Sequence, residues 1–140
     1  MALGQEVMTD YATTSLSLKQ HPVSLIRPML DEMRIIPACR LADLPQETWV
    51  KVVGLVLVRQ RPATASGIVF ETLEDETGTA NIIIRTQIYE RYRAAARHAV
   101  LLECDGYIER NGMVIHILAR RLTDLTHLIN DLHHHSRDFH

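Results

Sequence analysis

The stretch that decides the fold is residues 50–58, which read Val-Lys-Val-Val-Gly-Leu-Val-Leu-Val. This run is short, apolar and rich in β-branched residues, and these properties favour a β-strand. Gly54 stands in its middle, and a glycine inside a strand indicates a bulge or a sharp bend. In a small barrel, one strand that bends at its centre can belong to both halves of the sheet. Residues 50–58 therefore predict the first strand of such a barrel.

Two more strands follow, joined by an acidic turn. Residues 68–73 and 79–85 are typical of strands in their length and in their content of apolar residues. The residues between them, Glu74–Gly78, are mostly acidic and could suggest a magnesium site. We expect instead that Asp75 orders the turn by accepting hydrogen bonds from backbone N–H groups.

A helix and a hairpin complete the pattern. Apolar residues recur at steps of three and four across residues 88–99, which predicts a helix. Residues 100–109 and 113–121 predict two strands, and Asn111-Gly112 between them favours a type I′ turn with positive φ at both central residues. Residues 122–132 predict a last short helix. Three strands, a helix and a hairpin match the OB-fold, a mainly β, five-stranded Greek-key barrel with a helix between strands three and four.

The first 48 residues predict short helices. Apolar spacing near 3.6 over Val23–Met33 indicates a helix that Pro22 can begin, because the missing N–H of proline has no partner in a first turn. Pro28 would kink or split this helix, and a short turn around Leu41–Leu44 follows. The chain therefore divides into a helical N-terminal segment, an OB-fold domain and a C-terminal helix or tail, at residues 1–48, 49–125 and 126–140.

Composition narrows the class of protein. The 140 residues have a formal net charge of −2, so any affinity for phosphates must come from local patches. The longest apolar run, Val52–Val58, is much shorter than the roughly twenty residues that span a bilayer, so no membrane is expected as a partner. Cys39 and Cys104 form neither a Cys-x-x-Cys pair nor a disulfide framework, which favours the reducing cytoplasm.

No motif argues for catalysis. The sequence contains no Gly-x-Ser-x-Gly, no cysteine with a nearby catalytic histidine and no phosphate-binding glycine loop that ends in lysine. His133–His135 are consecutive, whereas a structural zinc site normally needs four Cys or His ligands at set spacings. We therefore expect no catalytic residue, no metal site and no cofactor.

A barrel of this class binds single strands on the face of its second and third strands, between the first–second and fourth–fifth loops. Both loops carry arginines, and others end the third and fifth strands. Exposed aromatic residues could stack bases, although a barrel with few aromatics could also need Phe70 in its core. Five phosphate contacts would give a salt slope of about −3.5, and hence weak, salt-sensitive binding. The candidate nucleic-acid-binding residues are Arg59, Arg61, Phe70, Thr72, Arg85, Tyr107, Arg110 and Arg120.

Several stretches resemble a known family. Val53–Pro62, Thr72–Gly78 and Tyr89–Arg93 are similar to the C-terminal OB-fold domain of bacterial C-family DNA polymerases. Leu16–Pro22 resembles the segment that precedes that domain, and Ser136–His140 is similar to the very end of the error-prone, DNA polymerase III alpha-subunit-like branch. The resemblance extends over essentially the whole chain.

This resemblance implies an accessory domain that handles single-stranded template DNA in translesion synthesis and DNA repair. The palm and fingers of the family do not fit into 140 residues, so the resemblance implies no polymerase activity in this chain itself. The alternative is a protein-interaction module that docks other repair or replication subunits, which the nearly balanced charge and the scarcity of aromatics favour. A domain that reads RNA is a third possibility.

Overall fold

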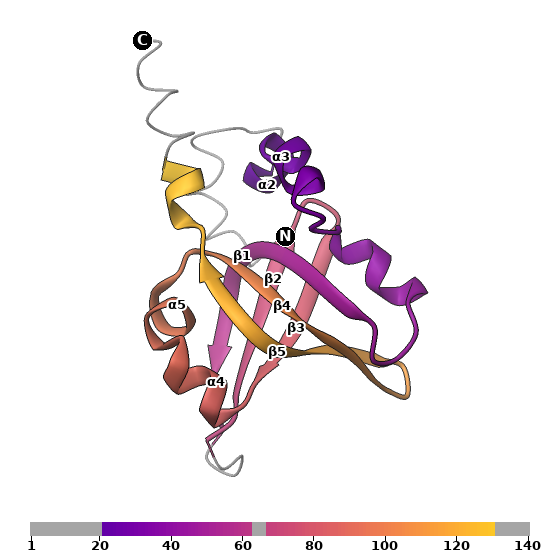
Figure 1. The fold of residues 1–140 in the computed structure, drawn as a ribbon, viewed down its shortest axis with the longest axis vertical. Helices are drawn as coiled ribbons and strands as arrows, with labels where there is room; N and C mark the ends of the chain where they lie inside the picture. The colour runs from indigo at the N-terminus through magenta and orange to yellow at the C-terminus, as the bar shows by residue number, and fades with distance from the viewer. Residues whose placement is uncertain (1–20, 63–66, 131–140) are drawn as a thin grey trace, which may run out of the picture.

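The computed structural model describes residues 21–62 and 67–130. Five strands close into a barrel in the order β1-β2-β3-β5-β4 (Figure 1). All neighbouring strands are antiparallel except β3 and β5, which run parallel. The predicted mainly β, five-stranded barrel is confirmed, and it is consistent with an OB-fold. The strands are β1 (Trp49–Gln60), β2 (Val69–Asp75), β3 (Gly78–Ile84), β4 (Leu101–Asn111) and β5 (Val114–Asp124).

Strand β1 pairs with two neighbours, β4 along its first half and β2 along its second. Gly54 lies at the change-over, where a Cβ atom would stand 2.7 Å from the backbone nitrogen of Glu74. The close approach of β2 therefore requires glycine there. The irregularity in register falls between Val56 and Val58, so the bulge is not at Gly54 itself.

The turn between β2 and β3 depends on Asp75. Its Oδ1 accepts the backbone N–H of Thr77 at 2.8 Å and that of Gly78 at 3.1 Å, which confirms the role predicted for this carboxylate. Its Oδ2 accepts the backbone N–H of Ala38 at 2.8 Å. One buried side chain thus shapes the turn and attaches the N-terminal segment to the barrel.

The hairpin between β4 and β5 is confirmed, but its turn is centred one residue later than predicted. Asn111 faces Val114 in register, so Gly112 and Met113 are the two loop residues. Gly112 has a φ of 71°, whereas Asn111 does not lie in the positive-φ region. One positive φ at the first loop position is the type II′ pattern, so the predicted type I′ turn is wrong.

Two short helices, α4 (Thr86–Arg91) and α5 (Arg93–His98), lie between β3 and β4 and cover one end of the barrel (Figure 1). They break at Tyr92, so the single helix predicted over residues 88–99 is divided. Ala95 and Ala96 of α5 are buried against the barrel interior. That interior is filled mainly by aliphatic side chains, among them Val52, Leu73, Ile82, Leu102 and Ile117.

At the C-terminal end, β5 continues to Asp124 and helical turns occupy residues 126–130. The helix predicted over residues 122–132 is therefore wrong in its first four residues. The histidines at 133–135 and the stretch Ser136–His140 lie outside the described residues, as does most of Leu16–Pro22.

The N-terminal segment contains α2 (Pro22–Leu25), α3 (Arg27–Glu32) and the 3₁₀ helix η1 (Ala38–Asp43). The helix predicted there is split at Ile26, and Pro28 lies in the first turn of α3, where a proline is tolerated.

This segment packs on the outside of the barrel. Val23 and Leu30 are fully buried in a second apolar cluster with Val53 and Leu101 of the strands. Arg27 binds Glu76 of the β2–β3 turn through an Nε–Oε2 contact of 2.8 Å. Residues 21–48 therefore contact the barrel directly, while the division of the chain near residues 48 and 125 stays a prediction.

Candidate nucleic-acid interface

One row of outward-pointing side chains runs around the outside of the barrel. Phe70 on β2 pairs with Ile83 on β3, and Ile83 pairs with Leu118 on β5. Leu118 pairs with Tyr107 on β4, and Tyr107 pairs with Trp49 on β1. Paired side chains project from the same side of a sheet, so these five side chains form one continuous strip, here named the transverse row.

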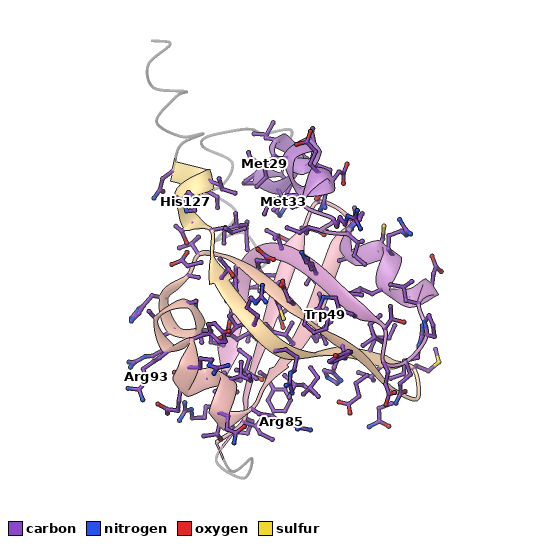
Figure 2. The ribbon with its side chains drawn as sticks, in the orientation of Figure 1. Met29, Met33, Trp49, Arg85, Arg93 and His127 are labelled. Carbon is purple, nitrogen blue, oxygen red and sulfur yellow. The ribbon has the colours of Figure 1, made fainter. Side chains whose placement is uncertain are left out.

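The aromatic members of the transverse row are open to ligands. Trp49 is 44% exposed and Tyr107 is 41% exposed. Their ring centroids lie 4.9 Å apart at an interplanar angle of 75°, an edge-to-face contact that holds both rings in place (Figure 2 labels Trp49). Phe70 is half-buried and points outward with Thr72, so it is on the outer face and not among the buried residues of the core.

A polar row runs beside the transverse row. Thr72 pairs with Asn81, Asn81 pairs with His116, and His116 pairs with Glu109. The Oγ1 atom of Thr72 donates to Oδ1 of Asn81 at 3.1 Å. The outer surface of the barrel thus offers an apolar strip and, next to it, hydrogen-bonding groups that could contact base edges.

Arg85 and Arg120 stand at one edge of this face. Arg85 follows β3 two residues after Ile83, and Arg120 lies two residues after Leu118 on the parallel strand β5. Both arginines are exposed, and neither guanidinium makes a hydrogen bond or an ion pair with any residue that the structure describes. Two unpaired cations therefore lie beside the apolar strip.

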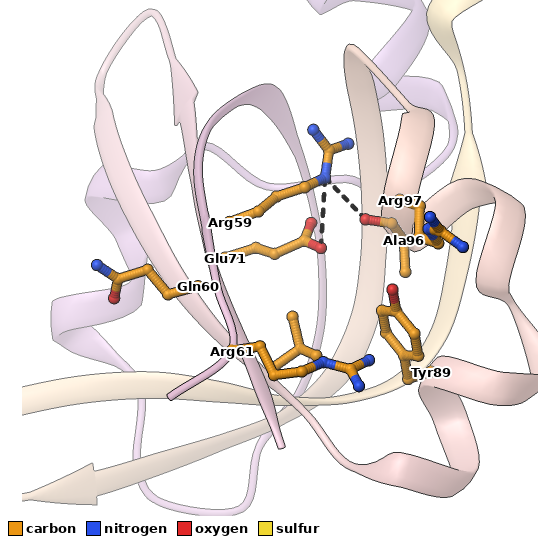
Figure 3. A pocket seen from close by; sticks show the side chains of 8 residues that line it. Arg59, Gln60, Arg61, Glu71, Tyr89, Ala96 and Arg97 are labelled. Atoms are coloured by element: carbon orange, nitrogen blue, oxygen red, sulfur yellow. Dashed lines mark hydrogen bonds and ion pairs between the residues drawn. The ribbon is translucent and has the colours of Figure 1, made fainter. Parts of the chain in front are cut away.

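Arg59 occupies a different place. It pairs in register with the inward-pointing Glu71, and its Nε donates to the carbonyl oxygen of Ala96 at 2.8 Å (Figure 3). A second guanidinium nitrogen donates to the carbonyl of Ala99. Arg59 therefore clamps α5 onto β1, and its predicted phosphate contact stays a prediction.

Beneath Arg59 lies a buried carboxylate. Glu71 is only 1% exposed, and neither of its oxygens accepts a hydrogen bond from a described residue. Burial raises the pKa of Glu71 to about 7, against the opposing effect of Arg59, whose Nε lies 3.6 Å from Oε2. The two side chains line a cavity of about 180 Å³ at the helix-covered end, together with Gln60, Arg61, Val69, Tyr89, Ala96 and Arg97 (Figure 3).

Arg110, at the opposite end of the barrel, is also engaged within the protein. Its guanidinium donates to the carbonyl of Leu44 at 2.6 Å and to that of Ala42 at 2.7 Å. These bonds tie the β4–β5 hairpin to the end of η1. A contact of Arg110 with nucleic acid stays a prediction too.

Five of the eight predicted residues, Phe70, Thr72, Arg85, Tyr107 and Arg120, lie on the outer surface of the barrel, in or beside the transverse row. Sequence reasoning missed Trp49, Ile83 and Leu118, which complete the transverse row. Ile83 stands in the run Ile82–Ile84, where no alternation of polar and apolar residues shows which side chain points outward. Only the register of the strands reveals the row.

Within residues 21–62 and 67–130, no helix combines the length and the apolar character that crossing a bilayer demands. The same residues contain no group of three or more His, Cys, Asp or Glu side chains arranged to hold a metal ion.

The fold and this face define a small OB-like barrel domain of a kind that fits a nucleic-acid-binding module. Solved structures with this fold include asparaginyl-tRNA synthetase from Pyrococcus horikoshii, with a TM-score of 0.54, 14% identity and coverage of 65% of this chain and 23% of that one. The OBody AM1L10, solved bound to hen egg-white lysozyme, gives a TM-score of 0.52 at 12% identity over 66% of this chain and 91% of that one. At these identities the likeness concerns the fold alone.

No protein-family model matches the chain, but error-prone DNA polymerases match it along nearly its whole length. The protein of Azoarcus sp. (strain BH72) is 45% identical over 97% of this chain, and that of Caulobacter vibrioides is 47% identical over 94%. The protein of Ralstonia nicotianae is 42% identical over 99%. The chain is homologous to one small domain of error-prone DNA polymerases, and it spans only 12–13% of the length of these relatives.

Proposed function

We propose that this domain binds single-stranded DNA across the outward face of β2, β3, β5 and β4, and that it handles template in translesion synthesis and DNA repair. The observation that carries the proposal is the transverse row, flanked by the unpaired Arg85 and Arg120. The domain would perform no catalysis of its own. The free thiols of Cys39 and Cys104 are in keeping with the cytoplasm, where we place the protein.

The dimensions of the row suit a short strand. Five neighbouring strands at a spacing of about 4.8 Å make it about 19 Å long, measured along the curved outer surface of the barrel. This length is enough for the few nucleotides that a small OB barrel binds. Each stacked base contributes about 1–3 kcal/mol. Two free arginines give a salt slope of about −1.4, smaller than the slope expected from five contacts, because Arg59 and Arg110 are bonded within the protein.

Fluorescence anisotropy with an oligo-dT of about six nucleotides tests this proposal. Phe70→Ala and Tyr107→Ala should each weaken binding by at least about fivefold, the lower limit for one lost stack. Leu57→Ala is the matched control, because Leu57 is 40% exposed on β1 but is not in the transverse row. Unchanged affinity in both row variants, with melting curves that show a folded protein, would refute the proposal. Oligo-U in a parallel titration separates DNA from RNA.

A second candidate function is the docking of another protein. Leu25, Met29 and Met33 are 39–44% exposed along α2 and α3 (Figure 2 labels the two methionines). Glu47 and Glu109 line a cavity of about 310 Å³ with Tyr107, and their charge would repel phosphates at that end of the face. Cross-linking that captures repair or replication proteins through Met29 and Met33, in a domain without DNA affinity, would select this alternative.

A further inference from the structure

The two ends of the barrel carry opposite charge. Residues 85–98, which include α4 and α5, contain four arginines and a single acidic residue, Glu90. Arg61, just beyond the end of β1, adds another cation at this end. The β2–β3 turn, at the far end of β3, contains Glu74, Asp75 and Glu76. Arg27 forms ion pairs with Asp75 and Glu76, so one cation offsets part of this negative charge. Seven residues of β3 separate the two ends by about 20 Å.

The arginines at the helix-covered end are available to a ligand. Arg91 and Arg97 are exposed, and neither side chain has a partner among residues 21–62 and 67–130. Arg93 pairs with Glu90, an exposed ion pair that holds it only weakly. The guanidinium of Arg61 lies 4.5 Å from the ring centroid of Tyr89, a contact that orients the group and leaves its charge uncompensated. We name Arg61, Arg91, Arg93 and Arg97 the basic end.

The basic end is continuous with the transverse row. Arg85 stands two residues after Ile83 of the row, and it is also the N-cap residue of α4. Its carbonyl accepts the backbone N–H of Tyr89 at 2.9 Å, which fixes α4 against the end of β3. Figure 2 shows Arg85 and Arg93 on the part of the molecule that α4 and α5 form. Exposed arginines thus extend from Arg85, beside the transverse row, to the basic end.

We propose that the basic end is a second nucleic-acid contact, which holds the phosphate backbone of the strand where it leaves the transverse row. This inference rests on the proposed function and gives the bound strand a path, from the row across Arg85 onto α4 and α5. The path leads away from the acidic β2–β3 turn, because the phosphate backbone is attracted to the positive end of the barrel and repelled by the negative end.

The expected effect is a salt dependence that changes with the length of the strand. A short oligonucleotide on the row meets two free arginines, for a slope of about −1.4, at about 0.7 for each contact. A strand that also reaches the basic end meets four more, for a slope of about −4. Between 50 and 200 mM salt, affinity for the long strand should fall about 300-fold, but only about sevenfold for the short one.

The test compares oligo-dT of about six and about sixteen nucleotides on the intact chain. In the double variant Arg91→Glu/Arg97→Glu, binding of the short strand should be unchanged, whereas the slope for the long strand should shrink by at least about 1.4. Arg34→Glu/Arg40→Glu is the matched control, because these arginines are also exposed but lie in the N-terminal segment.

The outcomes separate this inference from the proposed function. If both strands bind with the same salt slope and the double variant matches the wild type, the basic end makes no contact and the inference is overturned, while short-strand binding upholds the row. If neither oligonucleotide binds the wild type, the proposed function and the inference are both refuted. If the control variant lowers the slope as much as the double variant does, the effect is one of net charge alone and the inference is overturned.

Discussion

Replacement of Glu71 by glutamine should change how the stability of the domain depends on pH. The carboxyl group is buried, its oxygens accept no hydrogen bond from a described residue, and its pKa is raised from 4.5 to about 7, mainly by burial. Between these two values the folded state keeps a proton that the unfolded state has released. The free energy of unfolding of the wild type therefore falls as pH rises through this range.

The size of the effect follows from the shift in pKa. One pKa unit corresponds to about 1.4 kcal/mol, so ionised Glu71 costs the folded state about 3 kcal/mol at alkaline pH. Glutamine does not titrate. Between pH 5 and pH 8, the free energy of unfolding of Glu71→Gln should therefore rise by about 2 to 3 kcal/mol relative to that of the wild type.

Urea unfolding at several pH values measures this difference. Glu109→Gln, on the exposed side of β4, is the control and should follow the wild type at every pH. The raised pKa of Glu103, also about 7 and caused first by burial, is common to all three proteins and cancels in the comparison. A difference between Glu71→Gln and the wild type that stays constant from pH 5 to pH 8 would refute the reasoning.

Three further predictions concern stability and reactivity. Arg110→Ala should lower the free energy of unfolding by about 1–3 kcal/mol, because the hydrogen bonds to η1 are lost. Its affinity for the short strand should stay unchanged. A strong loss of affinity in a folded variant would show that Arg110 contacts DNA. Gly106→Ala should unfold or severely destabilise the domain, because the new Cβ would lie 2.1 Å from the carbonyl oxygen of Leu118, and a melting temperature like that of the wild type would contradict this. An alkylating reagent should label the exposed Cys39 of the native protein at once. It should label Cys104 only after unfolding, because this thiol is buried and burial raises its pKa. Equal labelling rates of the two cysteines would contradict the burial of Cys104.

The fold could be predicted because its signals are local. The β-branched run at residues 50–58 and the glycine of the hairpin each act within a few residues, and the order of the elements then leaves few topologies. The two breaks in the helices, at Ile26 and at Tyr92, differ in whether a local sequence signal marks them. Pro28 predicts the break near Ile26. No proline or glycine lies at Tyr92, so the sequence predicts one helix there, whereas two form.

The site could be predicted only in part, because the role of an arginine depends on partners far along the chain. Arg59 and Arg120 look alike in sequence, each at or near the end of a predicted strand. Arg59 is bonded to a carbonyl 37 positions away, and Arg120 has no partner among the described residues. The transverse row is a similar case, because its members come from all five strands and meet only through register.

We propose above that single-stranded DNA lies on the transverse row. The most direct measurement is a map of backbone amide chemical shifts during titration of the ¹⁵N-labelled domain with oligo-dT. If DNA binds there, the largest changes should fall at Phe70, Ile83, Leu118 and Tyr107 and continue through Arg85. Changes confined to α2 and α3, or none at saturating DNA, would contradict this proposal.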